Sequence, residues 1–201
     1  MTSTRDQRAK ETRRRMTAAA CRLFSERGYA ATTMDAVAKE AGVAVQTTYF
    51  TFRNKASLLQ AAFEHAVLGP DEVPPHLSDW YRNARSAPDV ETAVRIFVDG
   101  NFAILQRAAP LSWVMSADKD GRATADYNEG LRRDGFREHI EAFAAKHPLR
   151  DGLSPEHALD LLLVLVGPHQ FQLFIGDYGW GLDEYRNWVV AVVLRELFAI
   201  G

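Results

Sequence analysis

A helix, a glycine and a second short helix follow one another within residues 32–59, and this order constrains the fold more than any other stretch of the chain. Thr32 and Asp35 have the spacing of a capping box, so a helix is expected to begin there. Gly42 should end it, because glycine readily takes the left-handed conformation found after a helix. Between them the apolar residues recur at helical spacing, at Met34, Val37, Ala38 and Ala41.

A second short helix is predicted over about residues 45–51, with polar side chains at its leading end. Val43, just before it, is expected to plug the space between the two helices. Asn54 is a favourable N-cap for a third helix that opens at Lys55. A helix, a turn that contains glycine and a short helix with a polar leading end together form a helix-turn-helix.

A family resemblance extends over roughly residues 10–65, about a third of the chain, in which many positions agree in order and spacing. The residues that carry it are Leu23-Phe24, Gly28-Tyr29, Thr32-Thr33, Val37-Ala38, Ala41-Gly42-Val43, Thr47, Tyr49, Phe52, Lys55 and Leu58-Leu59. In these positions the chain resembles the N-terminal DNA-binding domain of tetracycline-repressor-type (TetR) regulators.

Three positions depart from that pattern. Ala44 stands where a Ser or Thr N-cap is usual, which weakens the cap of the second helix by about 1 kcal/mol. Thr48 stands where an aliphatic residue is usual, and Thr51 replaces a common Tyr or His. The change at Thr51 affects one expected contact with a phosphate or a base.

The second helix is the predicted recognition helix. Val45, Gln46 and Thr47 form its leading turn, where helix-turn-helix proteins touch base edges, and Gln can bind adenine through two hydrogen bonds. Thr33, Tyr49 and Lys55 are better placed for phosphates, which position the protein without specifying sequence. The complete predicted DNA-binding set is Thr33, Val45, Gln46, Thr47, Tyr49, Phe50, Thr51 and Lys55.

The distribution of charge supports a polyanionic partner at one end of the chain. The formal net charge is −2, yet residues 1–60 hold 11 Lys and Arg against 5 Asp and Glu, while the remainder holds 13 against 21. The alternative is that Arg5 to Arg15 is only a solvated helix start. Next to a helix-turn-helix, contact with phosphate is the favoured interpretation.

The rest of the chain predicts an all-α protein. Pro110 is expected to open a short separate segment, and Asp118–Gly121 to form a polar break. We predict a three-helix DNA-binding domain over residues 1–54 and a helical ligand-binding and dimerisation domain over 55–201. The expected helices lie near residues 8–27, 55–68, 77–85, 90–107, 123–146, from 155 onward and 182–198.

Two stretches, 161–166 and 188–194, are apolar on every side. A helix of this kind must be buried all round, so one face covers the chain's own core and the other needs a partner. Two short buried strands would fit the β-branched content, but both stretches lie inside longer capped helical patterns. The resemblance implies a homodimer formed by the last two helices as a four-helix bundle. The predicted interface residues are Leu162, Val166, Phe174, Trp188, Val189, Val192 and Val193.

The resemblance also implies a small-molecule effector that binds in the middle of the chain. Asn101 and His169 interrupt apolar stripes, and Pro168 is expected to kink its helix and open space. Either polar residue can equally be a core residue bonded to backbone. The predicted pocket residues are Phe97, Asn101, Phe102, Leu105, Trp113, Met115, Tyr127 and His169.

Rival classes find little support in the sequence. The spacings of zinc and di-iron bundle sites, phosphate loops and the nucleophile elbow are not present, so neither an enzyme nor a cofactor is expected. The single Cys21 is expected to be a small buried filler rather than a redox sensor. Because the N-terminus is charged and no long uncharged stretch occurs, we expect no signal peptide, no membrane span and a cytoplasmic location.

The function that follows is a ligand-responsive DNA-binding regulator, namely a repressor that a small, largely apolar molecule releases from its operator. The first alternative is a DNA-binding regulator without an effector. The second is an enzyme built on a helical bundle.

Overall fold

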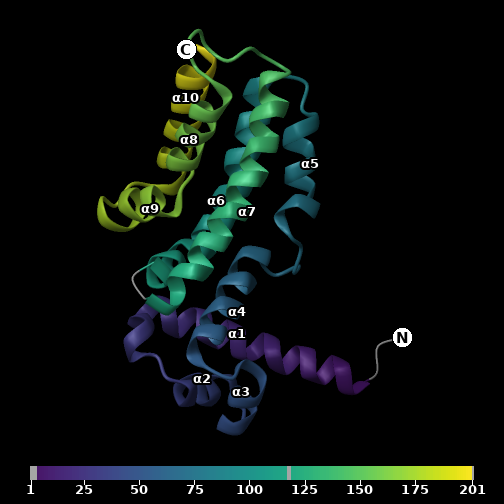
Figure 1. The fold of residues 1–201 in the computed structure, drawn as a ribbon, viewed down its shortest axis with the longest axis vertical. Coiled ribbons are helices and arrows are strands. Elements are labelled where there is room, and N and C mark those ends of the chain that lie inside the picture. The colour runs from purple at the N-terminus through teal and green to yellow at the C-terminus, as the bar shows by residue number, and fades with distance from the viewer. Residues whose placement is uncertain (1–3, 117–118, 201) are drawn as a thin grey trace. The chain divides into compact units, whose positions relative to one another are not determined.

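The computed structural model describes residues 4–116 and 119–200, and every regular element among them is a helix (Figure 1). The chain divides into two compact units, Met1–Glu72 with Pro110–Asp126 and Val73–Ala109 with Tyr127–Gly201. The elements are α1 (Thr4–Ala31), α2 (Met34–Ala41), α3 (Val45–Phe52), α4 (Lys55–Leu68), a 3₁₀ turn (Pro75–Leu77), α5 (Asp79–Ser86), α6 (Val90–Ser116), α7 (Lys119–Ala144), α8 (Pro155–Leu165), α9 (Pro168–Phe171), a π-helical turn (Gln172–Asp177) and α10 (Leu182–Phe198).

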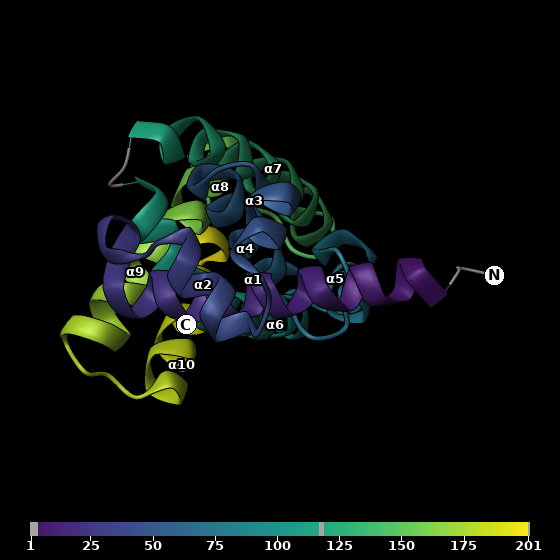
Figure 2. The ribbon, with the colours of Figure 1, turned by 90° about the horizontal axis from the view of Figure 1, so that it is seen from below.

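In the first unit, α1 packs against α2 and α4, and α2 packs against α3. The first turns of α1 extend past α2 and α3, as Figures 1 and 2 both show. Gly28 interrupts the helical dihedrals near the end of α1 with a φ of 75°, which a glycine adopts without strain. Its buried core is built from Met16, Leu23, Phe24, Val37 and Leu58.

The start of α2 is one residue later than the capping-box pattern predicts. Thr33 is the N-cap, and its Oγ1 accepts a hydrogen bond from the backbone N of Ala36 at 3.1 Å. Thr32 is fully buried instead, and its hydroxyl lies 3.0 Å from Leu23 O and 2.8 Å from Gly28 O. The predicted C-cap is confirmed, since Gly42 is left-handed with a φ of 64°.

The helix α4 packs with the helix-turn-helix and not with the second unit. Leu58, Leu59 and Ala62 are buried, and α4 lies along α1. The compact first unit therefore extends past the predicted domain boundary between residues 54 and 55. That boundary, as a division between functions, stays a prediction.

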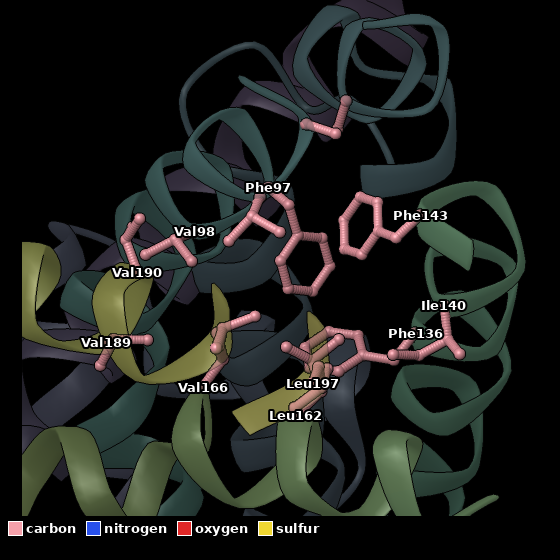
Figure 3. Packing of buried hydrophobic residues seen from close by; sticks show 14 of the residues in the cluster. Phe97, Val98, Phe136, Ile140, Phe143, Leu162, Val166, Val189, Val190 and Leu197 are labelled. Carbon is pink, nitrogen blue, oxygen red and sulfur yellow. The ribbon is translucent and has the colours of Figure 1, made fainter. Parts of the chain in front are cut away.

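The second unit is held together by an aromatic and aliphatic core drawn from α6, α7, α8 and α10. The ring of Phe97 lies 4.8 Å from that of Phe136 and 5.6 Å from that of Phe143, edge to face in both cases. Figure 3 shows these rings facing one another, with Val166 and Leu197 close by. Edge-to-face pairs of this kind add about 0.5–1.5 kcal/mol beyond the area they bury.

Pro110 does not break its helix, so that prediction was wrong. The helix α6 runs from Val90 to Ser116 with Pro110 inside it. Beyond the proline, Leu111 and Met115 are both buried, and this burial outweighs the backbone hydrogen bond that proline cannot donate. The helix α7 begins at Lys119, within the predicted polar break, and Asp118 lies outside the described residues.

Pro168 does not kink a helix from within, because the helix has already ended. The helix α8 stops at Leu165, Gly167 is extended, and Pro168 is the first residue of α9, where its missing N–H costs nothing. By length and composition Pro155–Asp177 would suffice to cross a membrane. This is weak evidence, since it covers α8, the short α9 and a π-helical turn, and core helices of soluble proteins pass the same test.

Candidate functional site

The helix α3 is fixed to the first unit by its inner face. Thr48 is fully buried, with its hydroxyl 3.5 Å from the sulfur of Met16. Phe52 is also buried, and the guanidinium of Arg13 lies 4.7 Å from the centre of its ring. Ala44 caps the helix without a side-chain hydrogen bond, as its identity predicts. Packing on α1, rather than a polar cap, therefore determines which face of α3 is exposed.

The outer face of α3 presents polar and aromatic side chains to solvent. Gln46 is exposed, Val45 and Thr47 are half-buried, and Tyr49 is 49% exposed. The phenyl ring of Phe50 is 90% exposed, the largest value among the large hydrophobic residues described. A helix with an exposed amide beside exposed rings suits the major groove, where Gln binds adenine and apolar groups contact the thymine methyl.

Three of the predicted DNA-binding residues already have partners within the protein. Thr33 caps α2, and the hydroxyl of Thr51 donates to Thr47 O at 2.8 Å. The ammonium of Lys55 donates to Tyr29 O at 2.7 Å and lies 4.2 Å from the centre of the Tyr29 ring. Their roles in contacting DNA stay predictions, and any such contact must be made alongside these bonds.

Cys21 joins α1 to α4 inside the first unit. Its Sγ lies 3.0 Å from Ala62 O, to which the thiol donates. Burial raises the pKa of the Cys21 thiol to about 12, so the reactive thiolate is disfavoured at neutral pH. These two observations agree with the small buried filler expected from the sequence.

Comparison with known proteins identifies this unit. Residues 17–62 match the family model described as bacterial regulatory proteins, tetR family. These residues form the DNA-binding domain of a TetR-family regulator. The match covers α2 and α3 completely, together with the packing partners of α3 on α1.

Solved structures share the fold of the whole regulator. NalD of Pseudomonas aeruginosa, the secondary repressor of the MexAB-OprM multidrug efflux pump, is 21% identical with a TM-score of 0.70, covering 96% of this chain and 98% of NalD. FadR of Bacillus subtilis in complex with stearoyl-CoA is 16% identical with a TM-score of 0.72, covering 90% and 97%. The SmeT–triclosan complex is 19% identical with a TM-score of 0.72, covering 93% and 91%. No curated protein sequence matches the regulator.

The structure does not bring the predicted pocket residues together as one lining. Trp113 and Met115 belong to the first unit, whereas the other six belong to the second. His169 is exposed because the helical spacing that predicted its inward position stops at Gly167. Tyr127 and Trp113 are exposed as well, while the remaining members are buried, namely Phe97, Asn101, Phe102, Leu105 and Met115.

Asn101 fits the structural alternative for a buried amide. Its Nδ2 donates to Phe97 O at 2.8 Å, one helical turn back on α6. Phe102, beside it, packs against the rings of Phe171 and Tyr185 at 5.4 Å and 5.3 Å. The contacts of these two side chains are those of a packed core, and a role in binding an effector stays a prediction.

His139 on α7 is a buried titratable residue that the sequence analysis missed. It is fully buried, and its ring lies 4.3 Å from that of Tyr81 and 4.7 Å from that of Phe97. Burial lowers the pKa of His139 to about 4, although a hydrogen bond between Nδ1 and Gly135 O, at 2.9 Å, acts in the opposite direction. Neutral His139 therefore donates from Nδ1.

Most of the predicted dimer residues lie in the core of a single subunit. Leu162, Val166, Val189 and Val193 are buried in the second unit, and Val192 is almost so. Trp188 and Phe174 are exceptions, since Trp188 is 38% exposed and Phe174 is partly buried, with their rings stacked 5.3 Å apart. As interface residues, the first four are corrected by the structure.

Other residues of α8 and α10 form the exposed apolar surface that the sequence led us to expect. On α8, Val164 is 53% exposed and Leu161 is 37% exposed. On α10, Trp188 and Ala191 are exposed one turn apart. The two helices lie side by side in Figure 1 and contact each other. We call these four residues the α8–α10 surface.

Replacing Gln46 with Ala is expected to relax sequence preference at one base pair of the operator by about 1–3 kcal/mol, because one bidentate contact is lost. The measurement is binding to the operator and to single-base variants of it, alongside random DNA. Thr51→Ala is a matched control on the same helix, since its hydroxyl is bonded to Thr47 O. Equal losses on operator and random DNA for Gln46→Ala would remove Gln46 from the base-contacting set.

Proposed function

We propose that the regulator is a homodimeric repressor that holds an operator in the cytoplasm and is released from it by a small, largely apolar molecule. The observation that carries DNA binding is the outer face of α3, where Gln46 and the ring of Phe50 are exposed on a helix of the matched family domain. The net positive charge of residues 1–60 supports the same partner.

Dimerisation is supported by the α8–α10 surface. Leu161, Val164 and Trp188 are large apolar side chains, and their exposure on two packed helices is typical of a surface that a second subunit covers. A two-fold dimer presents two recognition helices to successive major grooves, about 34–36 Å apart. The proposed interface therefore consists of Leu161, Val164, Phe174, Trp188 and Ala191.

The proposal of an effector rests on the second unit and on the structures that share its fold. Its core is rich in aromatic rings and contains two buried polar side chains, Asn101 and His139. Ligand sites in proteins commonly combine apolar walls with a few polar groups that fix orientation. FadR was solved with stearoyl-CoA and SmeT with triclosan. A helical unit of this kind is therefore a reasonable binding site for a small apolar molecule.

Two probes of different charge test the effector. Triclosan is largely neutral and apolar, whereas stearoyl-CoA is strongly anionic. Residues 61–201 hold 13 Lys and Arg against 21 Asp and Glu, so we expect the neutral probe to release the operator at a lower concentration than the anionic one. The measurements are fluorescence anisotropy of labelled operator and the thermal midpoint of the regulator with each probe.

An effector that shifts the equilibrium should change both measurements, because coupling energies of about 1–3 kcal/mol correspond to a change in affinity of roughly 5- to 150-fold. Neither release nor a shift of the midpoint with either probe would favour the regulator without an effector. Asn101→Leu then distinguishes a binding role from a structural one. Lost release with unchanged stability supports binding, whereas lower stability with intact release makes Asn101 a core residue.

A further inference from the structure

The backbone between α3 and α4 contains a tight and unusual turn at Arg53. Its φ is 62° and its ψ is −51°, and the backbone N of Asn54 lies 2.6 Å from Phe52 O. A hydrogen bond across a single residue with these dihedrals defines a γ-turn of the positive-φ kind, which is rare and strained. Glycine would adopt this φ far more easily than a residue with a Cβ atom.

The surroundings of Arg53 fix this conformation from both sides. On one side Phe52 is buried, and the N–H of Arg53 donates to Tyr49 O at 2.8 Å, which closes the last turn of α3. On the other side Asn54 caps α4, since its Oδ1 accepts from the N of Ser57 at 2.8 Å. Strained residues persist where neighbouring structure determines them, and they concentrate at functional sites.

The side chain of Arg53 is exposed and makes no ion pair or hydrogen bond with the described residues. Other cations of the first unit are occupied. Lys10 pairs with Glu72 at 2.7 Å, Arg22 pairs with Glu40 at 2.8 Å, and Lys55 donates to Tyr29 O. Arg53 is thus an uncompensated cation, located three residues after the exposed ring of Phe50 on the recognition helix.

We propose that Arg53 contacts a DNA phosphate and positions α3 in the major groove. This inference rests on the DNA-binding function proposed above. A guanidinium suits the contact because its planar N–H groups can bind two phosphate oxygens at once. The fixed turn holds the start of the side chain in one place, so that a residue just beyond α3 aligns the helix on the backbone while Gln46 contacts bases.

Three substitutions and a control test the contact. Arg53→Gln should make the slope of log affinity against log salt shallower by close to one unit, and at 0.1 M salt it should weaken operator and random DNA alike by about five- to tenfold. Arg53→Lys should keep the slope of the wild type. Arg95→Gln is the matched control, because it removes the same charge from an exposed pair with Glu91 in the second unit.

Arg53→Gly separates the contact from the turn. It should raise the thermal midpoint, since glycine relieves the strain, and it should lose DNA affinity and salt slope as Arg53→Gln does. An unchanged slope in Arg53→Gln and Arg53→Gly, while the wild type binds with a steep slope, would overturn the proposal. If the wild type itself bound no DNA, the DNA-binding function would fail instead, which is a different outcome.

Discussion

The double substitution Leu161→Asp and Val164→Asp is expected to divide the homodimer into folded monomers and to weaken operator binding by at least about 100-fold. Both side chains are partly exposed in a single subunit, at 37% and 53%, so their replacement leaves the subunit core intact. In the dimer the new carboxylates would be buried without partners, which is strongly unfavourable. Loss of the second half-site removes the gain from two linked contacts, typically 10²–10⁴-fold.

Sedimentation at micromolar concentration and operator binding measure the two parts of this result. Leu77→Asp is the matched control, because Leu77 is an exposed leucine at the 3₁₀ turn, away from the α8–α10 surface in sequence. Val193→Asp gives a contrast, since Val193 is buried in the subunit core and its substitution should unfold the protein. A wild type that sediments as a monomer would refute the interface itself.

Local signals in the sequence were sufficient where neighbouring residues determine the structure. Asn54 and Ser154 cap α4 and α8 as predicted, with hydrogen bonds from Ser57 N and His157 N. Gly42 ends α2 as predicted. Each of these depends on the side chain and backbone of a few consecutive residues, so the sequence alone determines them.

The prolines show where local reasoning was insufficient. Pro110 was expected to divide a helix and does not, because buried Leu111 and Met115 hold the following turns. Pro168 was expected inside a helix and stands at the start of one. In both cases tertiary packing or the preceding backbone decides the outcome, and neither is visible in the few residues around the proline.

The dimer and pocket predictions failed for a related reason. Helical spacing shows that a stretch such as 188–194 is apolar all round, but not which face its own subunit covers. The structure shows Val189 and Val193 inside and Trp188 outside. His139 was within reach of the sequence, because it falls on the same helical face as Phe136 and Phe143. That spacing places an ionisable ring in the core of the second unit.

The buried imidazole of His139 is expected to make the regulator unstable in mild acid. Its pKa is lowered from 6.5 to about 4, first by burial, with Arg85 adding a smaller effect in the same direction. Between these two values the unfolded chain binds a proton that the folded protein does not, so stability is complete above pH 6.5 and is lost as the pH falls toward 4. At about 1.4 kcal/mol per pH unit, the loss amounts to roughly 3 kcal/mol.

The groups around His139 do not compensate its charge. Tyr81 packs against the imidazole, but its hydroxyl is 2.9 Å from Glu138, and burial together with that bond raises the pKa of Tyr81 to about 12. Glu138 in turn pairs with Arg85 at 3.2 Å. The carboxylate nearest to the ring is thus occupied by other partners, and a protonated His139 would gain little from it.

Urea unfolding at several pH values between 7 and 4 measures the effect in the wild type and in His139→Met, which has a similar volume and does not titrate. The variant should lose stability less steeply with falling pH, because only the titration of the remaining groups is left. His157→Met, at an exposed position of α8, controls for the removal of one histidine. Identical pH slopes in the wild type and in His139→Met would mean that the imidazole is protonated in the folded state, contrary to its burial among the rings of Tyr81 and Phe97.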